Sequence, residues 1–355
     1  MKLLVVGSGL SGAVSARKYA EQGNTVLVVD KRNHIGGNCY SERDENGIMI
    51  HKYGPHIFHT NNLHIWQYVQ KFADFIPYIN RPKATYQKQV YSLPINLSTI
   101  NQFFGVNLTP KEAEKFIKQK RLQIENPQNF EEQALASMGE ELYRAFFYGY
   151  TVKQWGVEPK DIPASVIKRL PLRFNYNDNY YYDKYQGIPV NGYTEMFENI
   201  LSHPNIEVKL NTPFEHSMIK EFDRIFYTGP IDMFYNYKFG RLNYRTVFWE
   251  KAVYNGDFQG TAGMNYPEIH IPFTRVKEYK HYTPWENHKK TSVFIEYSKK
   301  TGEEDEPFYP SNFKEDKERL EQYQAVKTDK VTFLGRLGTY QYLDMDKTIF
   351  QALQI

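Results

Sequence analysis

The N-terminal segment carries a glycine-rich motif followed by an acidic residue. The motif, Gly7-Ser8-Gly9-Leu10-Ser11-Gly12, joins the apolar run Lys2–Val6 to the helix-compatible segment Leu10–Gln22, and a second apolar run, Thr25–Val29, ends at Asp30. Glycines let the backbone approach a pyrophosphate, the helix N-terminus offers unpaired N–H groups, and a carboxylate at this spacing accepts hydrogen bonds from a ribose. The motif therefore predicts an adenine-dinucleotide site; the alternative is a glycine turn that binds no ligand.

A second pair of glycines indicates which dinucleotide is bound. Gly36-Gly37-Asn38 lies shortly after Asp30, an arrangement that an NAD fold does not need and that is typical of FAD enzymes of the glutathione-reductase type. Near the C-terminus, the strand-like run Lys330–Leu334 precedes Gly335-Arg336-Leu337-Gly338-Thr339, which can direct another helix N-terminus at a flavin. We therefore predict an FAD fold assembled from separated segments, with further strands at Ile206–Leu210 and Asp223–Thr228.

Composition and charge exclude several classes of protein. The chain has 355 residues, 41% hydrophobic and 24% charged, and 44 basic and 41 acidic residues leave a net charge of +3, which does not suggest a nucleic-acid partner. Mean hydropathy is −0.64, and no apolar run approaches the ~18 residues that span a bilayer, so no membrane insertion is expected. The single cysteine, Cys39, excludes an intrachain disulfide framework. The first apolar run stops at Gly7, too short for a secretory signal, and we expect a cytoplasmic protein.

Two kinds of inserted structure are expected. Thr109-Pro110-Lys111-Glu112 combines a helix N-cap, a proline at the first helical position and a capping-box glutamate. Helical patterns over Lys111–Ile124 and Glu131–Tyr148 predict a helical lobe. Runs rich in β-branched and aromatic residues predict a mostly antiparallel sheet, at Ala84–Tyr91, Thr246–Ala252, Ile271–Glu278 and Thr291–Tyr297. The acidic stretch Gly302–Pro307 is expected to be a solvated loop.

The predicted fold class is α/β: a split FAD-binding Rossmann-like domain with an inserted helical lobe and a mostly antiparallel β-sheet domain. The expected boundaries are 1–80, 186–245 and 315–355 for the FAD-binding domain, 98–155 for the helical lobe, and 81–97, 156–185 and 246–314 for the sheet and substrate domain. Gly156, Pro159 and Pro163 suit a mobile lid over about 156–171.

The chain resembles the bacterial UDP-galactopyranose mutases over essentially its whole length. Besides the glycine loop and Gly36-Gly37-Asn38, the matching strings are His51–Thr60, Gly149–Gly156, Pro163–Pro171, Phe174–Tyr180, Tyr227–Asp232, Ile271–Arg275, Gly335–Tyr340 and Tyr342–Asp346. The resemblance implies FAD, active when reduced, and interconversion of UDP-galactopyranose and UDP-galactofuranose, with flavin N5 as nucleophile at the anomeric carbon and no net redox change. It also implies a homodimer. No segment dedicated to NAD(P)H is visible, so the electron donor is unknown.

The resemblance also assigns substrate contacts. Arg169 and Arg275 match two diphosphate-binding arginines, a role that suits forked guanidinium groups, and with His56 they are the predicted catalytic residues. Tyr150 and Trp155 match aromatic residues on the uridine side. The remaining substrate residues are the phosphate-binding tyrosines Tyr180, Tyr309 and Tyr342, together with Asp344 and, near the sugar, His59. From the residues alone, the alternatives are solvated surface charges for the arginines, ordinary core packing for the aromatics and a helix N-cap for Asp344.

Further residues are expected around the flavin. The resemblance places His56 near N5 and Arg336 facing the flavin, where positive charge favours the anionic reduced form. The candidate cofactor residues are Gly7, Gly9, Ser11, Gly12, Asp30, Lys31, Gly37, Asn38, His56, Gly229, Arg336, Tyr342 and Met345. No metal is expected at the clustered histidines His51, His56, His59 and His64, because Gly54-Pro55 breaks a helical ligand face and no thiol or carboxylate pair joins them. Cys39 is expected to be a small buried residue.

Two other functions fit the cofactor fold. A flavin oxidoreductase acting on an amine or alcohol would consume one reductant per product, whereas a mutase needs only priming. A catalytically inactive nucleotide-binding protein has no need of a flavin, and the arginines and aromatic residues together argue against it. Within mutase chemistry, UDP-N-acetylgalactosamine is an alternative substrate, because one side chain can decide whether an acetyl group fits.

Overall fold

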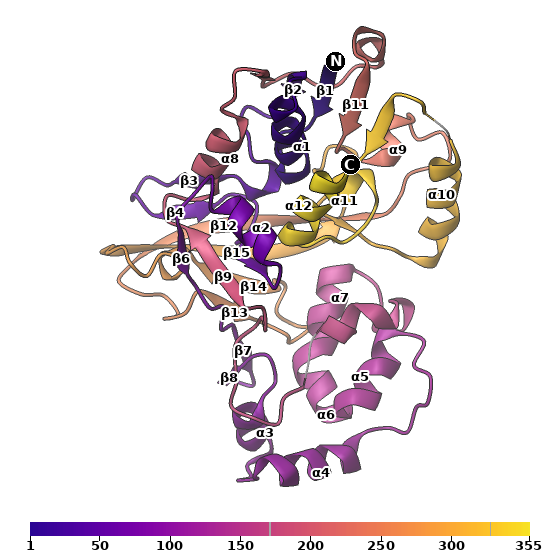
Figure 1. The fold of residues 1–355 in the computed structure, drawn as a ribbon. Helices are drawn as coiled ribbons and strands as arrows, with labels where there is room; N and C mark the ends of the chain where they lie inside the picture. The colour runs from indigo at the N-terminus through magenta and orange to yellow at the C-terminus, as the bar shows by residue number, and fades with distance from the viewer. Residues whose placement is uncertain (170–171, 327) are drawn as a thin grey trace. The chain divides into compact units, whose positions relative to one another are not determined.

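The computed structural model describes residues 1–169, 172–326 and 328–355, apart from the side chains at 165, 168 and 169. These residues form two compact units (Figure 1). Unit 1 contains Met1–Tyr78, Asp183–Thr246 and Thr301–Ile355, and unit 2 contains Ile79–Tyr182 and Val247–Lys300. Among the described helices, none is long and apolar enough to cross a lipid bilayer.

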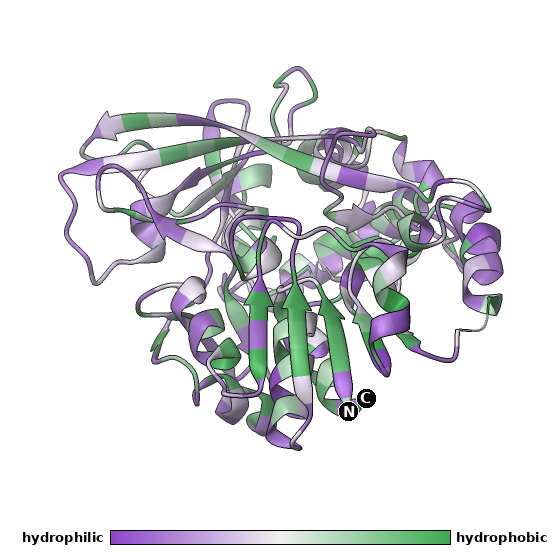
Figure 2. Ribbon diagram, turned by 90° about the horizontal axis from the view of Figure 1, so that it is seen from above, coloured by the Kyte–Doolittle hydropathy of each residue, from purple (hydrophilic) through white to green (hydrophobic). Residues whose placement is uncertain are grey.

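Unit 1 is built around a parallel sheet of order β10-β2-β1-β11-β17. The apolar run Leu3–Val6 is buried, as expected for a parallel strand covered on both faces, and Figure 2 shows these strands side by side as hydrophobic ribbons. All strands expected from the sequence in this sheet are confirmed to within one residue at each end, with bounds β1 (Lys2–Val6), β2 (Thr25–Val29), β10 (Ile206–Lys209), β11 (Arg224–Tyr227) and β17 (Val331–Phe333).

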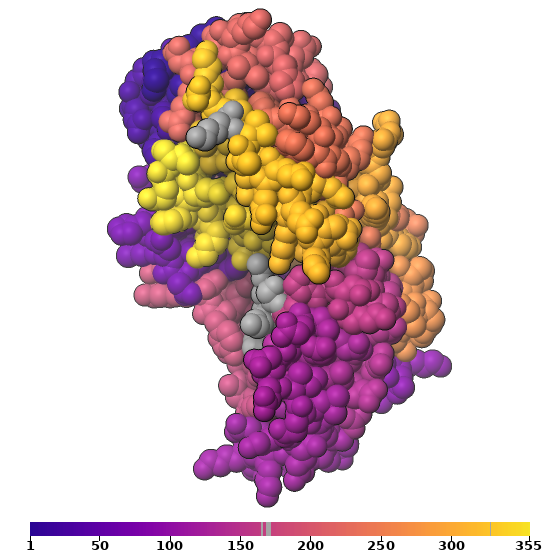
Figure 3. Space-filling view, turned by 90° about the vertical axis from the view of Figure 1, so that its right-hand side faces the viewer, coloured from indigo at the N-terminus to yellow at the C-terminus, as the bar shows by residue number. Residues whose placement is uncertain are grey.

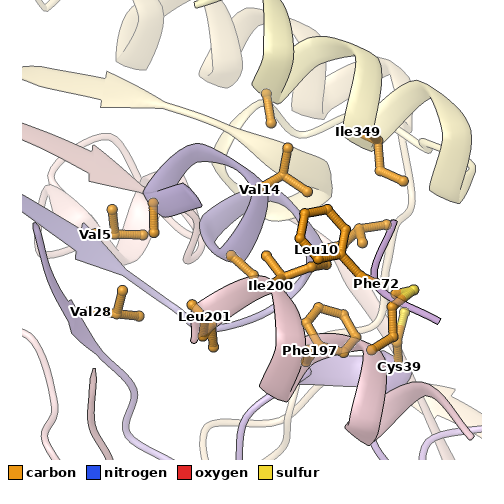
Figure 4. Packing of buried hydrophobic residues seen from close by; sticks show 14 of the residues in the cluster. Val5, Leu10, Val14, Val28, Cys39, Phe72, Phe197, Ile200, Leu201 and Ile349 are labelled. Carbon is orange, nitrogen blue, oxygen red and sulfur yellow. The ribbon is translucent and has the colours of Figure 1, made fainter. Parts of the chain in front are cut away.

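Three helices from distant parts of the chain form the main core of unit 1. α1 (Leu10–Glu21) packs against α8 (Tyr193–Leu201) and α12 (Met345–Gln354). Val14, Phe197 and Ile349, one from each helix, are fully buried in this core (Figure 4). The split fold expected from the sequence therefore rests on apolar packing between the first and the last helix of the chain.

The remaining elements of unit 1 are short. β5 (Phe58–Thr60), β9 (Tyr185–Pro189) and β6 (Phe75–Pro77) form an antiparallel sheet in that order, which pairs His59 with Gln186. β3 (Ser41–Arg43) pairs with β4 (Met49–His51). The others are η1 (Gly37–Cys39), α2 (Leu63–Val69), η5 (His216–Glu221), α9 (Ile231–Phe234), β16 (Tyr309–Pro310), α10 (Lys314–Ala325) and α11 (Gly335–Gly338).

Residues 97–161 of unit 2 are mostly helical, and the surface of this part of the chain is purple to magenta in Figure 3. The expected capping box is confirmed, because Thr109 N–H donates to Glu112 Oε2 (2.9 Å). The single helix expected over Glu131–Tyr148 is wrong: Gly139 has a φ of 82°, in the left-handed region that favours glycine and ends a helix. The bounds are α3 (Leu97–Phe104), α4 (Pro110–Lys120), α5 (Phe130–Met138), α6 (Glu140–Tyr143), the π-helix η2 (Arg144–Tyr148), α7 (Gly149–Trp155), η3 (Pro159–Asp161) and η4 (Ala164–Arg169).

A mostly antiparallel sheet forms the second part of unit 2. Its strands, in spatial order, are β12 (Tyr244–Asn255), β15 (Lys290–Lys300), β14 (Arg275–Glu278), β13 (Gly263–Asn265), β7 (Lys83–Tyr86) and β8 (Gln89–Ser92). β12 begins in unit 1, where Tyr244 pairs with Pro310, and β13 runs parallel to β7.

All four strands expected in this sheet have different bounds: β12 and β15 extend beyond the expected 246–252 and 291–297 at both ends, and the other two differ more. Ala84–Tyr91 is a hairpin rather than one strand, because Gln87 and Lys88 have φ values of 49° and 63°, as in the tight turns that join antiparallel strands. β14 begins only at Arg275, so that 271–274 belong to the loop before it.

The two units differ from the expected domain boundaries. The helical segment and the sheet belong to one unit, and residues 301–314 belong to unit 1. Part of the expected lid is tied to the start of α5, since Phe130 N–H donates to Ile162 O (2.8 Å) and Asn129 forms a β-bridge with Pro163. Residues 170–171, at the end of the expected lid, lie outside the described residues.

Substituting Gly149, the first residue of α7, will destabilise unit 2. A Cβ there would overlap the carbonyl oxygen of Pro267 and lie 2.9 Å from Ile269 N; both are backbone atoms, which cannot move aside as a side chain can. Alanine gains about 0.5–1 kcal/mol of helix propensity, whereas overpacking costs about 1–3 kcal/mol. We expect Gly149→Ala to lower the free energy of unfolding in urea by about 1–2 kcal/mol, and the exposed control Lys118→Ala to change it by under about 0.5 kcal/mol. Equal stability of both variants would contradict this packing.

Candidate cofactor and substrate sites

The glycine loop lies at the carboxyl end of β1, where the backbone atoms of its glycines pack closely together. A Cβ on Gly12 would overlap the carbonyl oxygen of Gly7, and a Cβ on Gly37 would lie 2.9 Å from Gly9 Cα. The first N–H groups of α1 have no acceptor within the helix. A surface that any side chain would fill, at a helix N-terminus, fits the pyrophosphate of a dinucleotide.

Asp30 follows β2 and is buried. Its Oδ2 accepts hydrogen bonds from Ser8 N (2.8 Å) and Ser8 Oγ (2.7 Å), and its Oδ1 accepts one from Arg32 N (2.9 Å). Each carboxylate oxygen can accept two hydrogen bonds, so Oδ1 has capacity for a ribose hydroxyl. Besides the contact expected from the sequence, Asp30 therefore fixes the glycine loop to the end of β2.

A cationic cluster lies beside this loop. Lys31 Nζ is 2.6 Å from Glu306 Oε1, and Arg32 Nη2 is 3.2 Å from Glu306 Oε2. Arg32 also donates to Asn38 Oδ1 (3.0 Å) and stacks over the Tyr53 ring. Burial would raise the pKa of Glu306, but the hydrogen bond from Lys31 and the charge of Arg32 lower it overall. The acidic stretch expected to be merely solvated thus supplies a partner for two cations.

Arg336 lies among the tyrosines that the sequence singled out. Its guanidinium is 5.2 Å from the centre of the Tyr309 ring and 4.8 Å from that of Tyr342, and the two rings stack at 5.7 Å. Arg336 Nη2 donates to Leu343 O (2.8 Å), which leads into α12. Unit 1 therefore brings three predicted residues together, with a positive charge at their centre.

Two histidines near this cluster, the buried His51 and the partly buried His56, are neutral. His51 Nδ1 accepts the N–H of His56 (2.9 Å), which requires an unprotonated Nδ1. His56 Nδ1 lies 2.8 Å from Gly54 O and therefore carries the proton. Burial lowers the pKa of His51 to about 3, and burial with the charge of Arg336 lowers the pKa of His56 to about 4.

These contacts also bear on metal binding. Nδ1 of both His51 and His56 is engaged by backbone atoms. In the part of the chain that the structure describes, the group with converging ligand atoms is instead Asp257, Glu278 and His281 in unit 2. Lys280 Nζ already pairs with Asp257 (2.5 Å), and the Glu278 carboxylate accepts backbone N–H groups from the adjacent loop 258–260.

A polar pocket of about 380 Å³ opens in unit 1, lined by His59, Asn61, Asn62, Asp183, Asp344, Asp346 and Lys347. His59 Nδ1 is 2.5 Å from Asp183 Oδ2, and the other oxygen of Asp183 accepts a hydrogen bond from the Asn61 amide. Asp344 occupies the N-cap position of α12 but makes no side-chain cap, so its carboxylate lines the pocket. The lining of this pocket thus contains two predicted substrate residues, His59 and Asp344. Its polar side chains can form hydrogen bonds with a sugar.

Arg275 begins β14 in unit 2 and is held by a buried carboxylate. Its Nε donates to Glu296 Oε1 (2.6 Å), and Glu296 is 1% exposed whereas Arg275 is 26% exposed. Trp249 Nε1 donates to Glu296 Oε2 (3.4 Å). The register that pairs Arg275 with Glu296 across β14 and β15 produces this contact. Glu296 therefore orients the guanidinium group of a side chain that is partly exposed.

The other predicted residues of unit 2 come from three further segments of that unit. Tyr150 and Trp155 lie on α7, and Trp155 packs partly against the helical core. Tyr180 N–H donates to Asn80 O (2.8 Å). The backbone of Arg169 ends η4, and its side chain lies outside the described residues.

The remaining candidates lie near the glycine loop or α12. Ser11 is buried in the first turn of α1, Gly229 is the second residue after β11, and Met345 begins α12. Cys39 is buried, and burial raises the pKa of its thiol to about 12. This fits a packing role for the cysteine and excludes a reactive thiolate at neutral pH.

Several partners of the site were not found from the sequence. Asp183, Glu296, Glu306 and Lys153 each contact residues far away in the chain, and no local spacing marks them. Lys31 is among the cofactor residues expected from the sequence, whereas Arg32, the next residue, is not. Its closeness to Asp30 and Asn38 was the available signal.

Comparisons with known proteins give a consistent result. A family model described as UDP-galactopyranose mutase matches residues 145–342, and an NAD(P)-binding Rossmann-like model matches residues 5–72. A protein of Klebsiella pneumoniae named probable UDP-galactopyranose mutase is 51% identical, over 99% of this chain and 93% of its own length. The dTDP-fucopyranose mutase of Escherichia coli is 50% identical, over 99% of this chain and 97% of its own. A solved structure of reduced UDP-galactopyranose mutase superposes with a TM-score of 0.77 at 16% identity, covering 99% of this chain and 94% of the other.

The neutral histidine pair predicts acid sensitivity. The folded-state pKa of His51 is about 3, below its ordinary value of 6.5, so the unfolded chain binds an extra proton between these pH values and stability falls as the pH falls through this window. One such group contributes a slope of about 1.4 kcal/mol per pH unit. His51→Asn keeps an acceptor near His56 N–H and removes the titrating ring. Between pH 6 and pH 4, we expect the free energy of unfolding, measured with denaturant, to fall less steeply with falling pH in His51→Asn than in the unmodified protein. The two slopes should differ by about that amount.

The control for this prediction is His64→Asn, because His64 is exposed on α2. Its pH slope should match that of the unmodified protein. An identical slope in His51→Asn and in the control would show that His51 does not resist protonation.

Proposed function

Because this chain belongs to the flavin-dependent UDP-galactopyranose mutase family, we propose that it interconverts UDP-galactopyranose and UDP-galactofuranose. The observation that carries the proposal is the 51% identity, over nearly the full length of both chains, with the Klebsiella pneumoniae relative. Two features of the structure support it: the polar pocket that contains His59 and Asp344, and the oriented, accessible Arg275.

The chemistry that reduced FAD supplies when bound is a nucleophile for the anomeric carbon, with no net oxidation of the sugar. The protein's own residues would hold it at the glycine loop, at Asp30 and at the N-terminus of α12. Arg336, which lies against both stacked rings of Tyr309 and Tyr342, would favour the anionic form of the reduced cofactor. The neutral His56 presents an imidazole that adds no competing positive charge there.

The protein must also stabilise the leaving group. A nucleoside diphosphate that separates from the sugar carries negative charge, which a guanidinium group stabilises with forked hydrogen bonds. We assign this task to Arg275 and Arg169. Glu296 fixes the orientation of Arg275 in advance, so that little reorganisation is needed when charge develops.

The protein must also hold the sugar in place. Its hydroxyl groups need donors and acceptors that hold one orientation while the ring opens and closes. His59, oriented through Nδ1 by Asp183, and the carboxylate of Asp344 provide such groups. We further propose that the enzyme works as a homodimer in the cytoplasm, receives electrons from a separate donor and provides galactofuranose for cell-surface polysaccharide.

A dTDP-fucose sugar nucleotide is a second candidate substrate, because the Escherichia coli dTDP-fucopyranose mutase is 50% identical to this chain. The two substrates differ in the methyl group of the base, in the 2′-hydroxyl group of the ribose and in the hydroxyl group at C6 of the transferred sugar. The test is to incubate the dithionite-reduced protein without oxygen with UDP-galactofuranose, and separately with dTDP-fucofuranose, and to separate the products by HPLC. We expect faster conversion of UDP-galactofuranose. Preference for the fucose nucleotide would replace the proposed substrate, and conversion of neither would refute the proposed function.

Removing either arginine should separate cofactor binding from turnover. We expect Arg275→Ala and Arg169→Ala to bind FAD normally and to lose activity by about 10²–10³-fold, the size typical for one preorganised charge-stabilising group. FAD content comes from the visible spectrum and turnover from HPLC. The matched control is Arg144→Ala, an exposed arginine of unit 2 that pairs with Glu131 and Glu140. A rate near normal in Arg275→Ala would exclude its diphosphate role.

A further inference from the structure

Lys153 has no role in the function proposed above, yet it makes an unusual set of contacts. It lies on α7 between Tyr150 and Trp155. Its ammonium donates to backbone carbonyls of the loop that joins β13 to β14: those of Tyr266 (2.5 Å), Glu268 (3.0 Å), Ile271 (2.9 Å) and Phe273 (2.9 Å). An ammonium has three N–H donors, so at least one is shared between two oxygens.

The loop closes around this cation. Tyr266 N–H donates to Thr274 O and Ile271 N–H to Glu268 O (2.9 and 3.1 Å). Converging carbonyl dipoles repel one another unless a positive charge lies among them. Burial lowers the pKa of Lys153 to about 8, so the amine is still mainly protonated at pH 7. The shape of the loop therefore depends on a charge supplied by α7.

Two further contacts join α7 to the same part of the sheet. Gly149 touches the backbone of Pro267 and Ile269 so closely that a Cβ would not fit. At the other end of the helix, Ser298 Oγ of β15 donates to Gln154 O (2.7 Å). α7 is thus attached to the β13–β14 loop at its first residue, and to β15 near its last residue.

Arg275 lies directly after this loop. Thr274 N–H and Thr274 Oγ1 both donate to Glu296 O (2.9 and 3.1 Å), and the side chain of Glu296 holds Arg275. Tyr150 and Trp155 on one side and Arg275 on the other therefore share one hydrogen-bonded framework within unit 2, and Lys153 connects its two halves.

We propose that Lys153 is a positioning residue that fixes the spacing between the helix bearing Tyr150 and Trp155 and the strand end bearing Arg275, so that one nucleoside diphosphate can contact both. The inference rests on the proposed function. Lys153 itself touches backbone and acts through the residues on either side of it. A ligand that spans both groups depends on this spacing, whereas a ligand that uses only one of them does not.

The test compares UDP with uridine on the oxidised, FAD-loaded protein. Lys153→Met keeps the length of the side chain and removes its charge. We expect the Kd for UDP, measured by calorimetry, to rise at least tenfold, while the Kd for uridine, measured by saturation-transfer NMR, stays within about twofold. FAD content should stay normal, and the exposed control Lys115→Met should leave both constants unchanged.

Two results would overturn the inference. One is a Kd for UDP within twofold of normal in Lys153→Met; the other is an equal loss for UDP and uridine, which would indicate local damage to α7 rather than altered spacing. If Lys153→Met does not fold, Ser298→Ala provides the test, because it removes the hydrogen bond between β15 and α7. A two- to fivefold rise in the Kd for UDP alone supports the inference, and an unchanged Kd contradicts it. Failure of the unmodified protein to bind UDP would instead refute the proposed function, and the inference with it.

Discussion

The structure of unit 1 depends on backbone segments that pack together without side chains. Gly12 lies against the carbonyl of Gly7, and Gly37 lies against Gly9, so the loops after β1 and β2 meet at the N-terminus of α1. Asp30 fastens this junction through Ser8. The first N–H groups of α1 lie at this junction and have no acceptor within the helix, so they suit a pyrophosphate, and the feature that closes the fold also prepares the cofactor site.

Charges in both units are held by partners that leave them accessible. Glu306 pairs with Lys31 and Arg32, stacked tyrosines flank Arg336, and Glu296 orients Arg275. Glu296 is the most deeply buried of these partners, and it holds Arg275, for which we propose contact with the diphosphate. Preorganised charge of this kind stabilises a transition state without rearrangement during the reaction, and the proposed departure and return of a diphosphate would require this.

Sequence reasoning recovers the features that neighbouring residues determine. The parallel strands follow from continuous apolar runs such as Thr25–Val29, and the start of α4 follows from its capping box. It fails where a single backbone angle decides, as at Gly139, which breaks an expected helix. It also cannot reveal Asp183, Glu296 or Lys153, because their partners come from distant segments that only folding brings near.

The central claim is that the bound flavin acts catalytically without being consumed. The most direct measurement counts turnovers per reduction: the protein is reduced once with a stoichiometric amount of dithionite, oxygen is excluded, and conversion of UDP-galactofuranose is followed until it stops. The account predicts many turnovers for each reduced flavin and none after reoxidation. One product per reduced flavin would contradict it and would identify a flavin oxidoreductase.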